Sequence, residues 1–199
     1  MADNKDGRDK QADNANRRQR ERDMLAELER GDETEPPVDE ATLEELSAEL
    51  DAVQFPATGA EVVAAVGDRT VESALGTARV AELLPETDTE TFDSPDDVRV
   101  RVQRPTIATA MKRVVEACET LPNKRLGTSQ REAYEKTFRA LKAIDADDDD
   151  EGIRAITDWI VDRIHDKEKL PNSRDVRREA AKFCRANGYE VSNNDWLGV

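Results

Sequence analysis

The sequence has few of the residues on which most metal and nucleophilic sites depend. Its 199 residues include two cysteines and one histidine. Cys118 and Cys184 stand far apart, so alone they form neither a disulfide framework nor a zinc motif. Each falls on the apolar face of an expected helix, where a cysteine is usually a small buried residue. His165 lies near an expected helix end, and we expect it at the surface.

Long apolar runs and catalytic motifs are also missing. No run approaches the roughly 20 apolar residues of a membrane span, and residues 1–22 have no apolar signal core. We therefore expect a cytoplasmic protein. The sequence contains no phosphate-binding glycine loop, no Gly-x-Ser-x-Gly elbow and no HExxH motif. These absences predict no enzyme activity, no cofactor, no metal and no small-molecule substrate.

Positive charge is scarce relative to negative charge. There are 45 acidic against 30 basic residues, a formal net charge of −15, and arginine outnumbers lysine. This composition resembles that of haloarchaeal cytoplasmic proteins, which stay hydrated in molar salt through surface carboxylates. The alternative is an ordinary acidic protein with a disordered acidic linker.

The few aromatic residues are unevenly distributed, which bears on domain organisation. Phe55 and Phe92 lie in the first half of the chain, and the other six lie in the second half: Tyr134, Phe138, Trp159, Phe183, Tyr189 and Trp196. Because aromatic side chains bury the most apolar area, we expect the larger core in the second half. We predict a disordered charged arm over residues 1–37, a small acidic helical domain over 38–104, and a helical bundle over 105–199.

Within residues 38–104 the apolar spacing predicts short helices with one hairpin. Leu43, Leu46 and Leu50 recur at helical spacing. A second helix should follow Thr58 and stop at Gly67, because a glycine suits the position just after a helix end. We expect a short hairpin over residues 68–76 and a third helix over residues 80–84, before Pro85.

Two signals compete over residues 94–102. Ser94 followed by Pro95 and two acids is a strong helix start, with a side-chain cap and charges that favour the helix dipole. The alternation of Val98, Val100 and Val102 is typical of a strand. We predict the helix, since its start signal is the more specific.

Several short motifs in this region resemble a small uncharacterised domain family common in haloarchaea. The resemblance covers residues 43–104, and its motifs are Phe55-Pro56, Gly67-Asp68, Leu83-Leu84-Pro85, Thr91-Phe92 and Ser94-Pro95-Asp96-Asp97-Val98. These are packing and capping elements. The resemblance therefore implies fold and lineage and no activity.

The remainder of the chain predicts a four-helix bundle. The first helix has apolar residues at 4-3-4-3 spacing from Ile107 to Leu121. A capping box of Ser129 and Glu132 should open the second helix, and an acidic linker at residues 145–151 should precede the third. The last begins after residues 170–173 and resembles the helix-turn-helix opening of GntR-type repressors. The short segment that follows this helix weakens any carry-over of sequence-specific DNA reading.

Charge is strongly segregated along the chain. Residues 23–98 carry 3 cations and 22 anions, whereas residues 99–142 carry 11 cations and 4 anions. The last helix adds four cations on one face. Together these define a candidate polyanion-binding set: Arg99, Arg101, Arg104, Lys112, Arg113, Lys124, Arg125, Arg131, Arg174, Arg178, Lys182 and Arg185.

Two functions remain open from the sequence. The basic residues 99–142 could pair with the chain's own acids, which favours a non-enzymatic adaptor or regulator that contacts another protein or itself. Alternatively they could bind a nucleic-acid backbone. High salt weakens phosphate binding steeply, which favours the adaptor.

Overall fold

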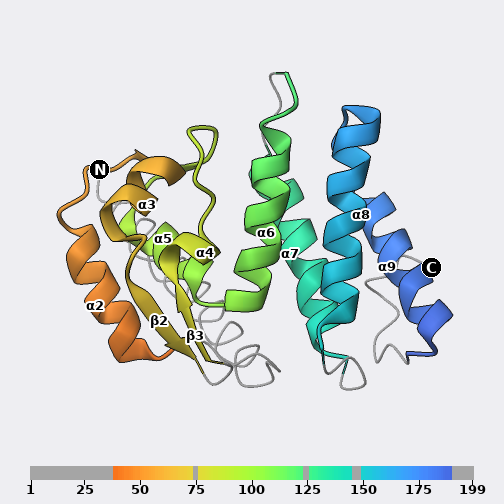
Figure 1. Ribbon diagram of the computed structural model, residues 1–199, viewed down its shortest axis with the longest axis horizontal. Helices are drawn as coiled ribbons and strands as arrows, with labels where there is room; N and C mark the ends of the chain where they lie inside the picture. The colour runs from red at the N-terminus through yellow and green to blue at the C-terminus, as the bar shows by residue number, and fades with distance from the viewer. Residues whose placement is uncertain (1–37, 74–75, 123–125, 145–148, 190–199) are drawn as a thin grey trace, which may run out of the picture. The chain divides into compact units, whose positions relative to one another are not determined.

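The computed structural model describes residues 38–73, 76–122, 126–144 and 149–189. Within these ranges the chain forms eight helices and two small two-stranded sheets (Figure 1). The predicted fold class, mainly α with a short hairpin ahead of a four-helix bundle, is confirmed. The predicted disordered arm, residues 1–37, lies outside the described residues.

The first part of the chain packs four helices, α2 to α5, and the hairpin around one core. Helix α2 (Glu40–Leu50) buries its leucines as predicted, and the Asp39 side chain caps it. Helix α3 (Gly59–Val66) begins at a capping box between Thr58 and Glu61. Strands β2 (Thr70–Ser73) and β3 (Gly76–Arg79) form the predicted hairpin, and α4 (Val80–Leu83) follows it directly.

A second strand pair was not predicted. Strands β1 (Ala57–Thr58) and β4 (Thr91–Phe92) pair antiparallel, with Ala57 opposite Phe92. Two residues are too few to show alternation in a sequence. This pair brings the segment before β4, which contains Glu90, close to the start of α3: the Gly59 amide donates to the Glu90 carbonyl at 3.0 Å.

Residues 95–102 form the predicted helix and not a strand. Helix α5 (Pro95–Val102) starts at a Ser94 cap, with Asp97 completing a capping box. Val98 and Val102 are buried, whereas Val100 points outward with 53% of its surface exposed. The alternation is therefore helical, because residues four apart share a face.

Helix α3 stops at Gly67, as predicted, but Gly67 does not adopt the left-handed conformation that is common for a glycine after a helix. Gly67 has a φ of −60°, which any residue can adopt. The glycine is required for space instead. A Cβ atom built on Gly67 would lie 2.4 Å from the Val63 carbonyl oxygen.

Four helices make up the second part of the described chain: α6 (Pro105–Cys118), α7 (Thr128–Lys142), α8 (Glu151–Lys167) and α9 (Ser173–Asn187). They lie side by side in Figure 1, and each of the six possible pairs except α6 with α9 is in close contact. The predicted capping box at Ser129 is wrong, because α7 begins at Thr128 and its cap, Gly127, lies two residues before Ser129. Most of the predicted acidic linker, residues 145–148, lies outside the described residues.

The described residues hold two hydrophobic cores that meet on α6. The first core contains the buried residues of α2 to α5, and the bundle core contains those of α6 to α9, including Tyr134 and Phe138. Ala108 belongs to the first core and its neighbour Ile107 to the bundle core. The predicted boundary at 104/105 thus falls between two helices that both contribute to the first core.

Gly59 at the start of α3 gives a first test of this packing. A Cβ atom there would lie 2.2 Å from the Pro85 carbonyl oxygen, which is backbone and has little freedom to move. We expect Gly59→Ala to destabilise the protein by about 1–3 kcal/mol, although alanine favours helices. Gly127→Ala is the control, since a Cβ atom there meets nothing within 4 Å. Equal unfolding free energies for both variants in urea would contradict the clash.

Candidate functional site

The predicted basic band over residues 99–142 is largely engaged within the chain. Arg99 on α5 forms an ion pair with Glu40 on α2. Arg113 on α6 pairs with Asp158 on α8 at 2.7 Å. Arg104 is half-buried and also interacts with another residue of the chain. Lys124 and Arg125 lie outside the described residues.

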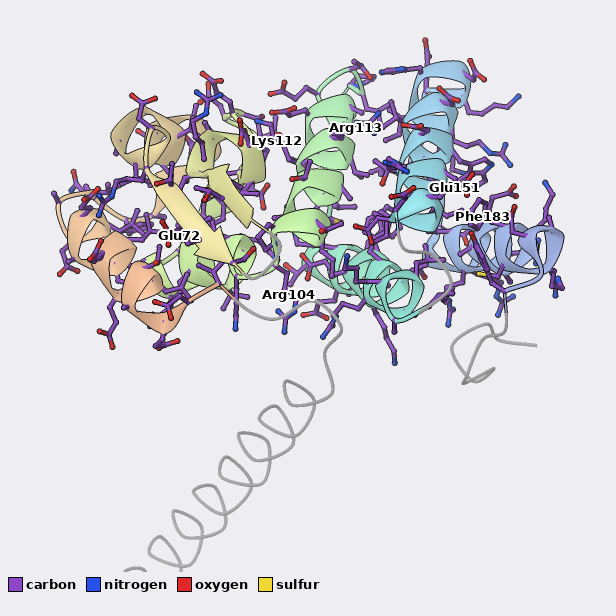
Figure 2. The ribbon with its side chains drawn as sticks, turned by 60° about the horizontal axis from the view of Figure 1, so that its bottom comes forward. Glu72, Arg104, Lys112, Arg113, Glu151 and Phe183 are labelled. Atoms are coloured by element: carbon purple, nitrogen blue, oxygen red, sulfur yellow. The ribbon has the colours of Figure 1, made fainter. Side chains whose placement is uncertain are left out.

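Lys112 joins the first core to α6. Its Nζ donates to the carbonyl oxygens of Ala81 at 3.0 Å and Leu84 at 2.9 Å, at the end of α4. A cation suits these carbonyls because the C-terminal end of a helix is partly negative. The Nζ also pairs with Glu116 at 2.8 Å. Lys112 and Arg113, although adjacent, thus point from α6 toward different helices (Figure 2).

Four charged residues form an ionic junction between the two cores: Glu90 and Arg131, which are buried, and Arg101 and Glu135, which are half-buried. Glu90 and Arg131 form an ion pair in which each side chain is only 7% exposed. Arg101 on α5 donates through Nη1 to Glu135 Oε1 on α7 at 2.7 Å, and its Nε lies 3.8 Å from Glu90 Oε1. The junction therefore links the segment before β4 and α5 to α7.

Burial sets the electrostatics of this junction. Burial, followed by the neighbouring Arg131, lowers the pKa of Arg101 below its ordinary value, and the carboxylates of Glu135 and Glu90 oppose this. Glu90 Oε2 and Arg101 Nε are buried without a hydrogen bond to any described residue. A polar cavity of about 270 Å³ adjoins them and is also lined by Cys118 and Thr128. A cavity of that size has room for water, which would satisfy both atoms.

The four cations predicted on one face of α9, called here the basic stripe, are more exposed than the paired cations of the band. Arg174, Arg178, Lys182 and Arg185 are all exposed, while Val176, Ala180 and Cys184 on the other side are buried as expected. Within the described residues the stripe makes two ion pairs, both within α9: Arg178 with Asp175 at 3.9 Å and Lys182 with Glu179 at 3.0 Å. Exposed pairs of this kind stabilise little, so these cations stay accessible to a partner.

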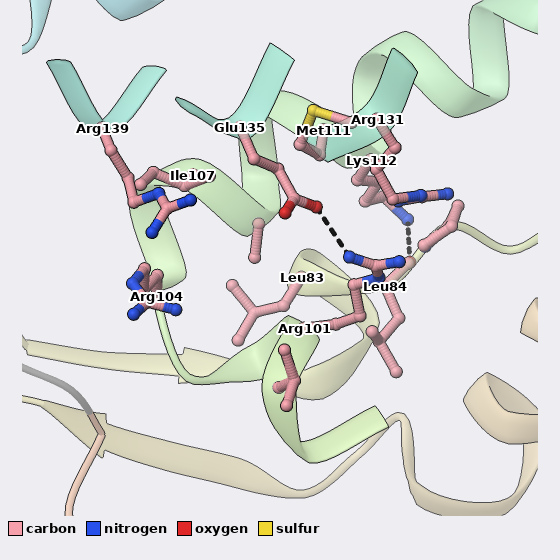
Figure 3. A pocket seen from close by; sticks show the side chains of 13 residues that line it. Leu83, Leu84, Arg101, Arg104, Ile107, Met111, Lys112, Arg131, Glu135 and Arg139 are labelled. Atoms are coloured by element: carbon pink, nitrogen blue, oxygen red, sulfur yellow. Dashed lines mark hydrogen bonds and ion pairs between the residues drawn. The ribbon is translucent and has the colours of Figure 1, made fainter. Parts of the chain in front are cut away.

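An apolar pocket beside the ionic junction was not predicted. It has a volume of about 210 Å³ and lies between α4, α5, α6 and α7 (Figure 3). Its apolar lining includes Leu83, Leu84, Ile107, Met111 and the exposed Val100, and its charged lining includes Arg101, Arg104, Lys112, Arg131, Glu135 and Arg139. Arg139 was not among the predicted polyanion-binding residues, and Val100 was not predicted to border a pocket. A hydrophobic residue on the outer face of α5 was a signal for such a surface.

The residues considered for metal or nucleophilic chemistry, Cys118, Cys184 and His165, differ in burial. Both cysteines are buried, as predicted, and burial raises the pKa of Cys118 to about 11. That thiol therefore stays protonated at neutral pH and is a poor nucleophile. His165 is exposed on α8, as predicted. Over the part of the chain that the structure describes, no three potential metal ligands come together.

Comparison with known proteins matches one segment of the chain. The fold and site describe a mainly helical protein with two cores joined by buried charges. Residues 37–114 match the model of a family of unknown function, DUF5789. An uncharacterised domain family was expected over residues 43–104, and this match supports that much. The match also includes the part of α6 that holds Ala108 and Lys112. No curated protein and no solved structure matches the chain.

No helix among the described residues combines the length and the apolar character needed to cross a bilayer.

Proposed function

We propose that the protein is a non-enzymatic adaptor or regulator of haloarchaeal, salt-adapted type, which works in the cytoplasm through contacts with another protein or with itself. The observation that carries the proposal is that cations of the basic band pair with carboxylates of the same chain. Arg99 pairs with Glu40, Arg101 with Glu135, and Arg131 with Glu90. Arg101 and Arg131 therefore link the two cores, and the paired cations of the described part of the band offer little to a polyanion.

The acidic surface supports the salt-adapted part of the proposal. A formal charge of −15 disfavours contact with nucleic-acid phosphates at low salt. At about 1 M salt the Debye length is only about 3 Å, so close contacts rather than long-range attraction determine which partner binds. Protein surfaces that combine apolar and ionic contacts retain affinity under those conditions.

A nuclease-controlled co-purification tests the adaptor function. We expect the full chain, immobilised in high salt, to retain a partner protein in stoichiometric amount, or a second copy of itself, and to keep it after nuclease treatment. Analytical ultracentrifugation of the purified protein separates the two cases. Loss of all retained protein on nuclease treatment would contradict the proposal, because the contact would then depend on nucleic acid.

A nucleic-acid-associated regulator is the second candidate, and one observation favours it: four exposed cations share one face of α9. Neutralising four phosphates would give a salt slope of log affinity of about −3 to −4. Under the adaptor proposal we expect weak DNA and RNA binding that is the same for wild type and for Arg174→Glu/Arg178→Glu, measured by fluorescence anisotropy across a salt series.

The matched control is Arg154→Glu/Arg163→Glu, which makes the same charge change at exposed positions of α8. A loss of at least about tenfold in affinity that is confined to the α9 variant would favour the nucleic-acid function.

A further inference from the structure

We propose that the polar cavity beside the ionic junction binds a free α-amino acid with a small side chain, held at both its ammonium and its carboxylate group. This inference goes beyond the proposed adaptor function, and it does not depend on which partner that function involves.

The polar cavity lies where four segments meet: the residues around the start of β4, helix α5, the end of α6 and the start of α7. Its volume is about 270 Å³. On its wall Glu90 and Arg131 are buried. Thr91, Gly127 and Thr128, which also line it, are exposed. The cavity therefore extends from the surface at the start of α7 to the buried Glu90, and a small molecule can enter from the surface.

Glu90 offers a hydrogen-bond acceptor at the buried end of the cavity. Its side chain is 7% exposed, and Oε1 pairs with Arg131. The other oxygen, Oε2, is buried without a hydrogen bond to any described residue. A buried carboxylate oxygen costs free energy unless a donor reaches it. An ammonium group, with three N–H donors and a positive charge, is a strong partner for such an oxygen.

Hydrogen-bond donors for a carboxylate line the same cavity. Arg101 Nε is buried without a hydrogen bond to any described residue. Helix α7 begins at Thr128 after Gly127, which has no side chain to cap the first amides. Amides at the start of a helix bind anions well, because that end of the helix is partly positive. A carboxylate in the cavity therefore has donors on both α5 and α7.

The charges of the ionic junction indicate that the ligand is neutral overall. Two arginines are matched by two carboxylates, since Arg101 pairs with Glu135 and Arg131 pairs with Glu90. A phosphate in the cavity would be repelled by the Glu90 carboxylate, and a metal cation would be repelled by the two arginines. A zwitterion brings one charge of each sign, so its ammonium suits Glu90 and its carboxylate suits the start of α7.

The size and the remaining lining of the cavity restrict the side chain of the amino acid. Sites for drug-sized ligands and cofactors usually enclose about 300–1,000 Å³, more than the 270 Å³ found here. Val115, Cys118 and Leu126 add a short apolar stretch to the wall. That stretch suits a methyl group or a hydrogen atom, so alanine and glycine are the expected ligands.

Equilibrium dialysis of the full chain against radiolabelled L-alanine, in high salt, tests the proposal. We expect saturable binding of one molecule per chain with a dissociation constant below about 1 mM, which a ligand of this size can reach. L-Alaninamide lacks the carboxylate and N-acetyl-L-alanine lacks the ammonium. Each should displace the label at least about tenfold less well than L-alanine, because each loses hydrogen bonds that involve a charged group.

The variant Thr128→Pro tests the start of α7. Proline removes the amide donor of Thr128, yet it is favoured at the first position of a helix. The preceding residue, Gly127, has a ψ of 152°, which is the extended conformation that proline requires before it. We expect a folded variant, checked by thermal unfolding, that binds L-alanine at least about tenfold more weakly.

The matched control is Ser173→Pro, which makes the same kind of change at the first residue of α9. Ser173 does not line the cavity, and its preceding residue, Asn172, is also extended with a ψ of 160°. We expect this control to bind L-alanine as the wild type does.

Several results would overturn the proposal. Absence of saturable binding would mean that the cavity holds only water. Displacement by L-alaninamide or N-acetyl-L-alanine as strong as that by L-alanine would show that only one end of the ligand is recognised. Unchanged binding in Thr128→Pro, or an equal loss in Ser173→Pro, would show that the amino acid binds elsewhere on the protein. None of these results bears on the adaptor function, which co-purification tests separately.

Discussion

Replacing Arg131 by methionine is expected to destabilise the protein by about 3 kcal/mol or more, because it leaves the buried Glu90 carboxylate without its main partner. Removing one member of a buried ion pair typically costs about 3–5 kcal/mol. Arg101 Nε, at 3.8 Å, compensates the charge in part, which places the expected loss toward the lower end. Urea unfolding followed by circular dichroism measures it.

The same substitution at an exposed pair is the control for this prediction. Arg113→Met breaks the pair with Asp158, in which the side chains are 48% and 58% exposed, and we expect a loss of at most about 1 kcal/mol. The double variant Glu90→Leu/Arg131→Met should be more stable than Arg131→Met alone, because it leaves no unpaired charge. Equal losses for Arg131→Met and Arg113→Met would show that burial of the ionic junction does not matter.

Much of the fold could be predicted because its signals are local. The Ser94-Pro95 start outweighed the valine alternation in α5, and the predicted break at residues 170–173 contains Asn172, which caps α9. Gly67 shows the limit of such reasoning. A glycine after a helix suggests a left-handed residue, but here it is needed because the Val63 carbonyl oxygen lies close by. That distance depends on packing that no local pattern reveals.

The candidate site could be predicted only in part, because its residues come together from distant segments. The burial of Arg131 could have been predicted from helical spacing. Arg131 shares a face of α7 with Tyr134 and Phe138, which are buried. A buried arginine requires a carboxylate. Which of 45 acids would meet it depended on the β1–β4 pair, whose two-residue strands give no periodicity.

The pocket could be predicted even less well than the ionic junction. The excess of positive charge over residues 99–142 was visible in the sequence, but the sequence did not show which of these cations pair with acids of the same chain. In the structure Arg101 and Arg131 belong to the junction and also line the pocket, whereas Arg104 and Arg139 line the pocket outside the junction. Arg139 and Arg131 are eight residues apart on α7, yet one is exposed and the other buried. The sequence predicted a single basic band, whereas the structure places some of these cations in a buried environment and others in an exposed one.

Phe138→Ala is expected to destabilise the protein by about 3–5 kcal/mol, since Phe138 is fully buried on α7, the helix that contacts α6, α8 and α9. For a chain of this size the thermal midpoint should fall by roughly 6–20 °C. Phe183→Ala makes the same change at a half-buried position beside Tyr189, and we expect a clearly smaller loss. Comparable losses would mean that the bundle core is not centred on Phe138.

The same variant tests whether the two cores unfold together. Ala108, Lys112 and the ionic junction connect the first core to α6 and α7, so a cavity in the bundle should weaken both cores. We expect Phe138→Ala to reduce hydrogen-exchange protection in α2 as much as in α7, because both open through one global unfolding step. If α2 amides keep their wild-type protection while those of α7 lose it, the two cores unfold separately and the buried charges do not couple them.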